Sequence, residues 1–148
     1  MALHEDEKIG NLRTGKFRIA GTSRVGGSVM WQNAVFTVTA ENSDEGVVSI
    51  QLKDGNQNNL TEAAVVNLYI SSLAGAVEAT TGPDGAVVID TNGVLINTIV
   101  TKKNYNFQSD STGLFDVNIT ESGAKSFFVN LIHPVSGEIF SSAEMIWT

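Results

Sequence analysis

The residues of this chain best placed to bind a metal ion lie in the segment DGNQNN, which begins at Asp54. Asp54, Asn56 and Asn58 match the first, third and fifth positions of a calcium-binding loop, where side-chain oxygens coordinate the ion. The match then fails, because the sixth position requires Gly and is Asn59, and the twelfth requires Glu and is Val65. We therefore favour an Asx-rich hairpin turn over a calcium site.

The two histidines, His4 and His133, are candidates for acid–base catalysis, but they lie far apart in the sequence. His133 directly precedes Pro134, which favours an extended backbone at a strand end. Asp84 and Asp90 would form a carboxylate pair if they met in space, although their spacing fits solvated loop charge equally well. No nucleophile elbow, phosphate loop, dinucleotide-binding glycine motif or zinc-protease motif occurs. We expect no enzyme activity, no cofactor and no bound metal.

The composition indicates one domain with an ordinary apolar core. The chain has 148 residues, of which 42% are hydrophobic and only 17% are charged, with polar turn-forming residues in place of the missing charge. It has no Cys, so no disulfide framework or thiol chemistry is available. No run approaches the roughly 18 apolar residues that a membrane span needs, and no signal-peptide pattern occurs near the first residues. We expect no membrane contact.

Charge is unevenly distributed along the chain. Residues 1–24 hold five basic and three acidic residues, a net charge of +2, whereas the remaining 124 hold four basic and thirteen acidic, a net charge of −9. An acidic body argues against nucleic-acid binding, which needs Lys and Arg to neutralise phosphates. The basic segment is either a solvated tail or an arm that docks on an acidic protein surface. The candidate attachment residues are Lys8, Arg13, Lys16, Phe17, Arg18 and Arg24.

From Ala34 onward the chain has the pattern of an all-β protein. Short segments rich in Val, Ile, Phe and Thr alternate with turn sequences such as TGPDG, DTNG and HPVSG, which predicts an antiparallel sandwich or barrel. A helix is the alternative only for LTEAAVVNLYI, where we favour a strand because of its β-branched and aromatic residues. The nine expected strand segments are AVFTVTA, GVVSIQLK, AAVVNLYISS, AVVID, VLINTIVT, YNFQS, GLFDVNIT, KSFFVNLIH and EIFSSAEMIW.

Alternation predicts the inner face of the last long strands. Their apolar residues recur at every second position, as expected where one face of a sheet is solvated. The two tryptophans, Trp31 and Trp147, lie at either end of the sheet region, and we favour packing at its edges over a recognition role. The predicted inner-face residues are Phe115, Val117, Ile119, Phe127, Val129 and Leu131.

Residues 1–33 fit the strand pattern poorly. They contain the Gly-rich segment RVGGSV and isolated apolar residues without a sustained period. We predict an extended N-terminal arm over 1–33, with at most one strand at 17–20, and a sandwich domain over 34–148. Deleting residues 1–24 should leave a folded domain.

The block from Val47 to Trp147, about two-thirds of the chain, resembles the immunoglobulin-like sandwich domain of structural proteins from tailed bacteriophages. The resemblance rests on VVSIQLKDGNQNNL, VVNLYISS, ATTGPDGAVVIDTNGVLI and the closing block from FQSDSTGLFDVNIT to FSSAEMIW. The Cys–Trp–Cys pattern of antibody-type domains is absent, so the resemblance implies an immunoglobulin-like antiparallel β-sandwich and no closer relationship.

The resemblance implies a non-enzymatic virion protein, made in the host cytoplasm. Our first hypothesis is a capsid decoration or head-accessory protein, whose basic arm binds the major capsid protein or another virion protein. The alternative is a neck, tail or fibre module that contacts a host-surface receptor or carbohydrate. We expect a homo-oligomer of closed symmetry, such as a trimer.

Overall fold

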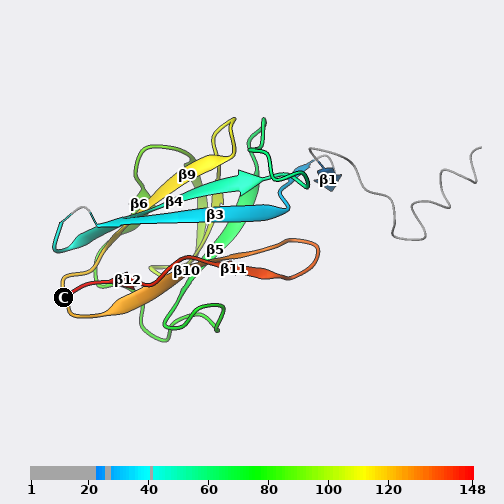
Figure 1. Ribbon diagram of the computed structural model, residues 1–148. Helices are drawn as coiled ribbons and strands as arrows, with labels where there is room; N and C mark the ends of the chain where they lie inside the picture. The colour runs from blue at the N-terminus through cyan, green and yellow to red at the C-terminus, as the bar shows by residue number, and fades with distance from the viewer. Residues whose placement is uncertain (1–22, 26–27, 41) are drawn as a thin grey trace, which may run out of the picture.

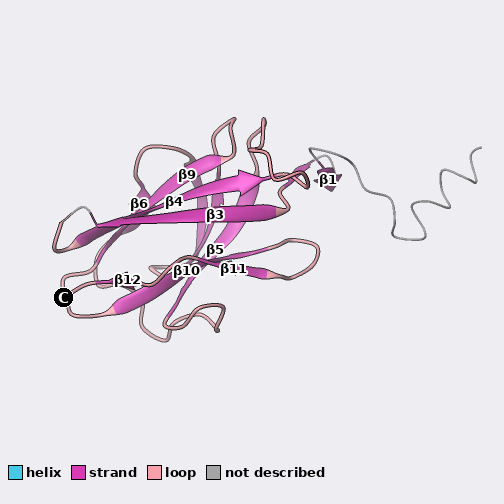
Figure 2. Cartoon of the chain, in the orientation of Figure 1, coloured by secondary structure: helices cyan, strands magenta, loops and turns pink. Residues whose placement is uncertain are grey.

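Two antiparallel β-sheets pack face to face in the computed structural model of this protein, which describes residues 23–25, 28–40 and 42–148 (Figure 1). Every regular element of these residues is a strand, and the two sheets enclose one apolar core (Figure 2). The described residues include no helix long and apolar enough to cross a membrane. The predicted all-β antiparallel sandwich is therefore confirmed.

Each sheet combines strands that are distant in the sequence. The four-stranded sheet has the order β3–β4–β9–β6, and the six-stranded sheet has the order β11–β10–β5–β8–β7, with β12 also paired to β10. The strands of the first sheet are β3 (Asn33–Ala40), β4 (Glu45–Lys53), β6 (Val87–Ile89) and β9 (Leu114–Thr120). The strands of the second are β5 (Val65–Ser71), β7 (Val94–Val100), β8 (Asn104–Gln108), β10 (Ser126–Ile132), β11 (Ile139–Ser141) and β12 (Met145–Ile146).

The nine predicted strand segments all contain strands. The last of them, EIFSSAEMIW, is divided into β11 and β12, which pair with opposite ends of β10. Ser142 lies at the break, where its N–H donates to the Val129 carbonyl and its hydroxyl accepts from the Val129 N–H. Residues 65–71 form β5, so the helix alternative for this region is wrong.

The predicted inner face is confirmed by burial and by register. Phe115 lies opposite Ile50 in the first sheet, and Val129 lies opposite Ile70 in the second. Between the sheets, the ring of Phe107 stacks on that of Phe115 with centroids 6.0 Å apart. The predicted residues Phe115, Val117, Ile119, Phe127, Val129 and Leu131 are all buried in the core.

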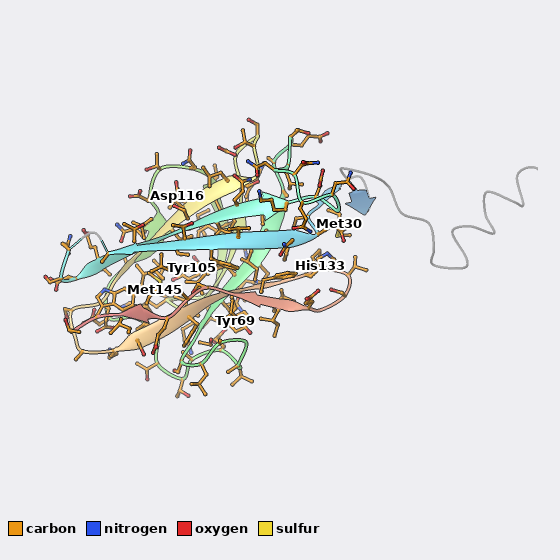
Figure 3. The ribbon with its side chains drawn as sticks, in the orientation of Figure 1. Met30, Tyr69, Tyr105, Asp116, His133 and Met145 are labelled. Carbon is orange, nitrogen blue, oxygen red and sulfur yellow. The ribbon has the colours of Figure 1, made fainter. Side chains whose placement is uncertain are left out.

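The apolar core includes residues a few positions before the boundary that the sequence predicted between arm and domain at residue 34. Trp31 has no exposed surface and belongs to the core, where its ring meets those of His133 and Phe140 edge to face, at centroid distances of 5.1 and 5.3 Å. Met30 is also buried, at the same end of the sandwich as His133 (Figure 3). One large ring that enters the core from a connecting segment produces no periodic pattern, so the alternation of strand residues could not locate it.

A short hairpin precedes this segment, where the sequence predicted an extended arm. Strands β1 (Ser23–Val25) and β2 (Ser28–Met30) pair antiparallel, with Val25 opposite Ser28. Two glycines separate the strands in the sequence, which is a two-residue hairpin signal. Strands of three residues are too short to show alternation, so only this glycine pair could have indicated them. The strand predicted at 17–20 lies outside the described residues.

Candidate binding surface

Most of the predicted attachment residues fall in the part of the chain that the structure does not describe. Lys8, Arg13, Lys16, Phe17 and Arg18 lie outside the described residues. Arg24 lies in β1, opposite Val29 of β2.

The candidate calcium loop is a turn in which the Asp54 carboxylate is hydrogen-bonded to the loop's own backbone. One carboxylate oxygen of Asp54 accepts from the backbone N–H of Asn56 at 2.7 Å and from that of Asn58 at 3.0 Å. These bonds close an Asx-type turn after β4, which confirms the hairpin interpretation. Within the residues that the structure describes, no group of three or more His, Asp or Glu side chains is arranged to hold a metal ion.

The imidazole of His133 makes hydrogen bonds that join two parts of the backbone. Its Nδ1 accepts from the backbone N–H groups of Val135, at 3.3 Å, and Ser136, at 3.1 Å. Because Nδ1 accepts, Nε2 carries the proton and donates to the carbonyl oxygen of Trp31 at 2.9 Å. The imidazole therefore links the β10–β11 turn to the segment that enters the core. This agrees with the prediction of a turn residue at a strand end.

A network of carboxylates ties two loops together. Glu121 is fully buried and accepts from the N–H groups of Asp84 and Gly123 and from the Lys125 ammonium, at 2.8 to 3.0 Å. Asp84 in turn accepts from the hydroxyl and N–H of Ser122, and these bonds hold the pKa of its carboxyl below the ordinary value. Asp90 instead accepts from its neighbour Thr91. Asp84 and Asp90 therefore have separate partners and do not form a carboxylate pair.

The most unusual surface of the described residues is the edge strand β7. All seven of its residues, Val94–Val100, are exposed, and its outer edge pairs with no other described strand. Its five large aliphatic side chains are between 36% and 58% exposed. It contains no charged residue and no proline, the two residue types that commonly protect sheet edges from association. The aliphatic residues are Val94, Leu95, Ile96, Ile99 and Val100.

The other described sheet edges do not combine a long strand with a row of exposed aliphatic side chains. β6 and β11 have three residues each, which makes them too short to template another strand. β3 is long, but its most exposed positions alternate with buried or half-buried ones, and only Val35 is a large aliphatic residue among them. Only β7 therefore combines length with exposed apolar side chains, among the described edges.

Local features position β7. Gly93 precedes it with a φ of +94°, in the left-handed region that glycine favours, and a Cβ there would lie 2.6 Å from the Cβ of Phe115. At the other end, the N–H of Lys103 donates to the Val100 carbonyl and turns the chain into β8. The register with β8 shifts twice, leaving Ile96 and Ile99 as bulged residues without a partner.

An asparagine row on the outer face of the sheet holds β7 to its neighbours. The amide nitrogen of Asn67 donates to the side-chain oxygens of Asn104 and Asn106, at 2.8 and 3.1 Å. Asn106 then donates to the side-chain oxygen of Asn97 in β7, at 3.0 Å. The row spans β5, β8 and β7, so it fixes the edge strand by side-chain bonds in addition to its backbone pairing.

An open hollow of about 330 Å³ lies on the same sheet, under the loop after β5. Its apolar lining includes Val77, Ile132 and Ile139, and its polar lining includes Glu78 and Asn104. The hydroxyl of Tyr69 also lines it and donates to the Ala76 carbonyl at 2.8 Å, and burial raises the pKa of that hydroxyl. The lining offers both aliphatic contact and hydrogen-bonding groups.

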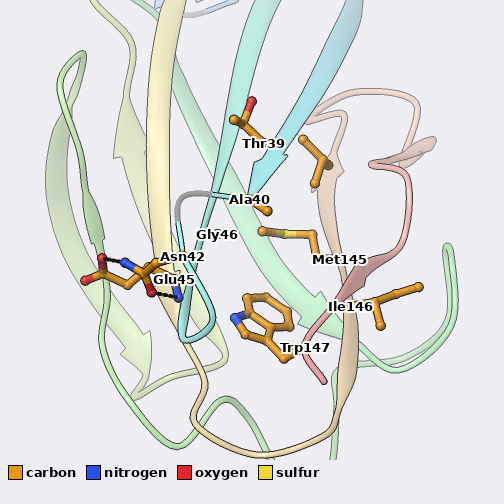
Figure 4. Close-up of a pocket in the computed structure, with 9 residues that line it drawn as sticks. Thr39, Ala40, Asn42, Glu45, Gly46, Met145, Ile146 and Trp147 are labelled. Carbon is orange, nitrogen blue, oxygen red and sulfur yellow. Dashed lines mark hydrogen bonds between the residues drawn. The ribbon is translucent and has the colours of Figure 1, made fainter.

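A second hollow, at the end of the sandwich near Trp147, is a packing feature (Figure 4). Its volume of about 40 Å³ holds little more than one water molecule. Gly46 allows this end to close, because a Cβ there would lie 3.0 Å from Met145 Cε and 3.2 Å from Trp147 Cζ2. The ring of Trp147 meets that of Phe127 edge to face, which agrees with the predicted packing role.

The sequence predicts a strand at β7 but does not indicate that it is exposed. VLINTIV has the composition of a buried strand, and its apolar residues do not alternate. β7 lies at the sheet edge because β8 is the one described strand that pairs with it. The sequence does not reveal this pairing.

Comparisons with known proteins assign no family. No model of a known protein family matches the chain. No curated protein sequence matches it. Among solved structures, the chain aligns at a TM-score of 0.35 with the crystal structure of a DUF4426 family protein from Pseudomonas aeruginosa PAO1, which is 12% identical. That alignment covers 84% of this chain and 94% of the other. A similarity this low indicates neither a shared function nor a shared fold family.

Proposed function

We propose that this protein is a non-enzymatic structural component of a tailed-bacteriophage particle, with an immunoglobulin-like sandwich that binds other proteins. The observation that carries the assembly role is β7, an uncharged edge strand with five exposed aliphatic residues. An edge of this kind presents unpaired backbone groups and apolar side chains together, the combination used when a strand is added from another chain. The placement in a phage particle is supported by the sequence resemblance.

Within the particle, we favour a capsid decoration or head-accessory role. The net charges of +2 for residues 1–24 and −9 for the rest of the chain support attachment through the N-terminal segment to an acidic surface of the shell. The acidic sandwich would then face outward. Lys8, Arg13, Lys16, Phe17, Arg18 and Arg24 remain the candidate attachment residues, with the major capsid protein or another virion protein as partner.

Copy number tests this role. Particles produced from the genome that encodes this chain should contain it at a copy number comparable to that of the major capsid protein, measured by quantitative mass spectrometry. A neck, tail or fibre component would be present in far fewer copies. Absence of the chain from purified particles would overturn the proposal.

The hollow under the loop after β5 favours a second candidate, a tail or fibre module that binds a receptor or a carbohydrate. Its aliphatic and amide lining suits a ligand that carries both apolar and hydroxyl groups. Saturation-transfer NMR with a panel of bacterial surface glycans tests it. Loss of the signal in Asn104→Ala, with retention in Asn118→Ala on the other sheet, would support this candidate over the first.

A further inference from the structure

The sequence of β7 is nearly symmetric about its centre. VLINTIV has Val at both ends, Leu95 and Ile99 inside them, and the β-branched residues Ile96 and Thr98 around Asn97. We propose that two copies of this protein associate through their β7 strands, paired antiparallel about a two-fold axis at Asn97, so that their six-stranded sheets become continuous. This inference rests on the assembly role proposed above and names a second copy as the partner of that edge.

The pairing places similar side chains opposite each other. With Asn97 opposite its own copy, Val94 lies opposite Val100, Leu95 opposite Ile99, and Ile96 opposite Thr98. Apolar and β-branched pairs directly across an antiparallel ladder are stabilising. A two-fold contact requires one surface to be complementary to itself, and this strand meets that requirement.

Charge also favours the pairing. A two-fold axis brings like charges together, and each copy carries a net charge of −7, yet β7 itself is uncharged. The Lys102 ammonium, beyond the end of β7, donates to the Asp84 carbonyl of its own copy, so the contact itself is left to the uncharged strand.

The two bulges of β7 are compatible with association. Bulges often protect an edge by twisting it away from a partner. Here the bulged residues are Ile96 and Ile99, which are 48% and 52% exposed and carry no protective charge. They add apolar surface for a partner to cover. The amide nitrogen of Asn97 remains available, since its oxygen accepts from Asn106 and no bond from the nitrogen to a described residue occurs.

Association of the purified full-length chain is the first test. Sedimentation velocity over micromolar to near-millimolar concentrations should show a shift from the chain mass of 15.8 kDa to twice that mass. Ile96→Lys should abolish the shift, because it brings charge into the apolar contact. Val35→Lys is the matched control, since Val35 is 47% exposed on the β3 edge and the variant has the same net charge. Circular dichroism verifies that each variant is folded, and Ile99→Lys replaces Ile96→Lys if the latter is not.

Single cysteines test the register, because the chain has none of its own. Asn97→Cys should form an intermolecular disulfide under mild oxidation, since each Cys lies directly opposite its copy. Val94→Cys should not, because its copy lies six residues away along the ladder, about 20 Å. Crosslinking of Val94→Cys alone would overturn the register.

The salt dependence of association distinguishes self-pairing from attachment through the basic segment. Pairing through uncharged strands of two acidic chains should strengthen as salt screens their repulsion. A wild-type chain that stays monomeric at all concentrations, or a dimer that salt weakens, would overturn the self-pairing. Neither result changes the copy number in particles, so the proposed function is judged separately.

Discussion

His133 and Trp31 are joined by a hydrogen bond and by ring contact, although 102 positions separate them in the sequence. The Nε2–H of the imidazole donates to the Trp31 carbonyl at 2.9 Å, and the two rings meet edge to face with centroids 5.1 Å apart. The bond anchors the segment before β3 to the end of β10. It holds the backbone at Trp31 against the end of the sandwich.

Replacing His133 should destabilise the protein. His133→Ala leaves the Trp31 carbonyl and the N–H groups of Val135 and Ser136 without their partner, and we expect a loss of about 1–3 kcal/mol in the free energy of unfolding. His133→Asn can still accept from the turn N–H groups, so it should lose less. Urea denaturation measures both. Equal stability of His133→Ala and wild type would contradict the linking role.

The register of β10 can be tested with adjacent phenylalanines. Phe127 is buried in the core, whereas Phe128 is half-buried on the outer face. Phe127→Ala should cost roughly 3–5 kcal/mol through lost transfer energy and the cavity left behind. Phe128→Ala should cost clearly less. The reverse order would mean a register shifted by one residue, which exchanges the two faces.

Truncation should locate the start of the domain. Deleting residues 1–22 leaves every core residue of the described part in place, so we expect an almost unchanged melting temperature together with loss of binding to the particle. Trp31→Ala in the full chain should instead destabilise the fold by about 3–5 kcal/mol. Thermal unfolding and cosedimentation with particles measure the two effects. Full binding by the truncated chain would place the attachment contact on the sandwich.

Two glycines with positive φ should respond differently to a methyl group. Gly137 has a φ of +71° and open space where a Cβ would lie, so Gly137→Ala should cost only the backbone penalty, about 1–2 kcal/mol. Gly93→Ala adds contacts of 2.6 Å to Phe115 Cβ and 2.8 Å to the Gln108 carbonyl. It should therefore be the more destabilising of the two in urea denaturation. Equal losses would show that the turn before β7 can move.

Stability should fall at acid pH through Asp84 and Asp110. Hydrogen bonds from Ser122 lower the pKa of Asp84. For Asp110, partial burial raises the pKa, but bonds from Leu114 and Thr112 outweigh it and the net shift is downward. The unfolded chain therefore takes up these protons first as the pH falls.

The stabilisation from these two carboxylates is complete above the ordinary pKa of 3.8 and is lost as the pH falls through the lowered values. Urea midpoints measured from about pH 5 down to about pH 3 should decline for the wild type. Asp84→Asn with Asp110→Asn should flatten that decline. If the urea midpoint of the double variant declines with pH as steeply as that of the wild type, other groups cause the acid sensitivity.

The sequence alone determined the strand segments after Ala34 and the buried faces of β9 and β10. Alternation at Phe115, Val117 and Ile119, and turn residues between strands, are local signals that follow directly from the two-residue period of a strand. The Asx turn at Asp54 could also be predicted locally, because DGNQNN is rich in turn-forming residues and lacks the Gly that a calcium loop requires at its sixth position.

Tertiary structure alone decided which strands became edges and which distant residues met. Burial of β7 or its exposure depends on whether a second strand pairs with it, and that partner is chosen by the order of the whole sheet. The link between Trp31 and His133 likewise depends on the closing of the sandwich, since only the packed sheets bring the chain entry to the end of β10. Local sequence carries the preference for a strand, whereas its neighbours are fixed by the lowest free energy of the complete core.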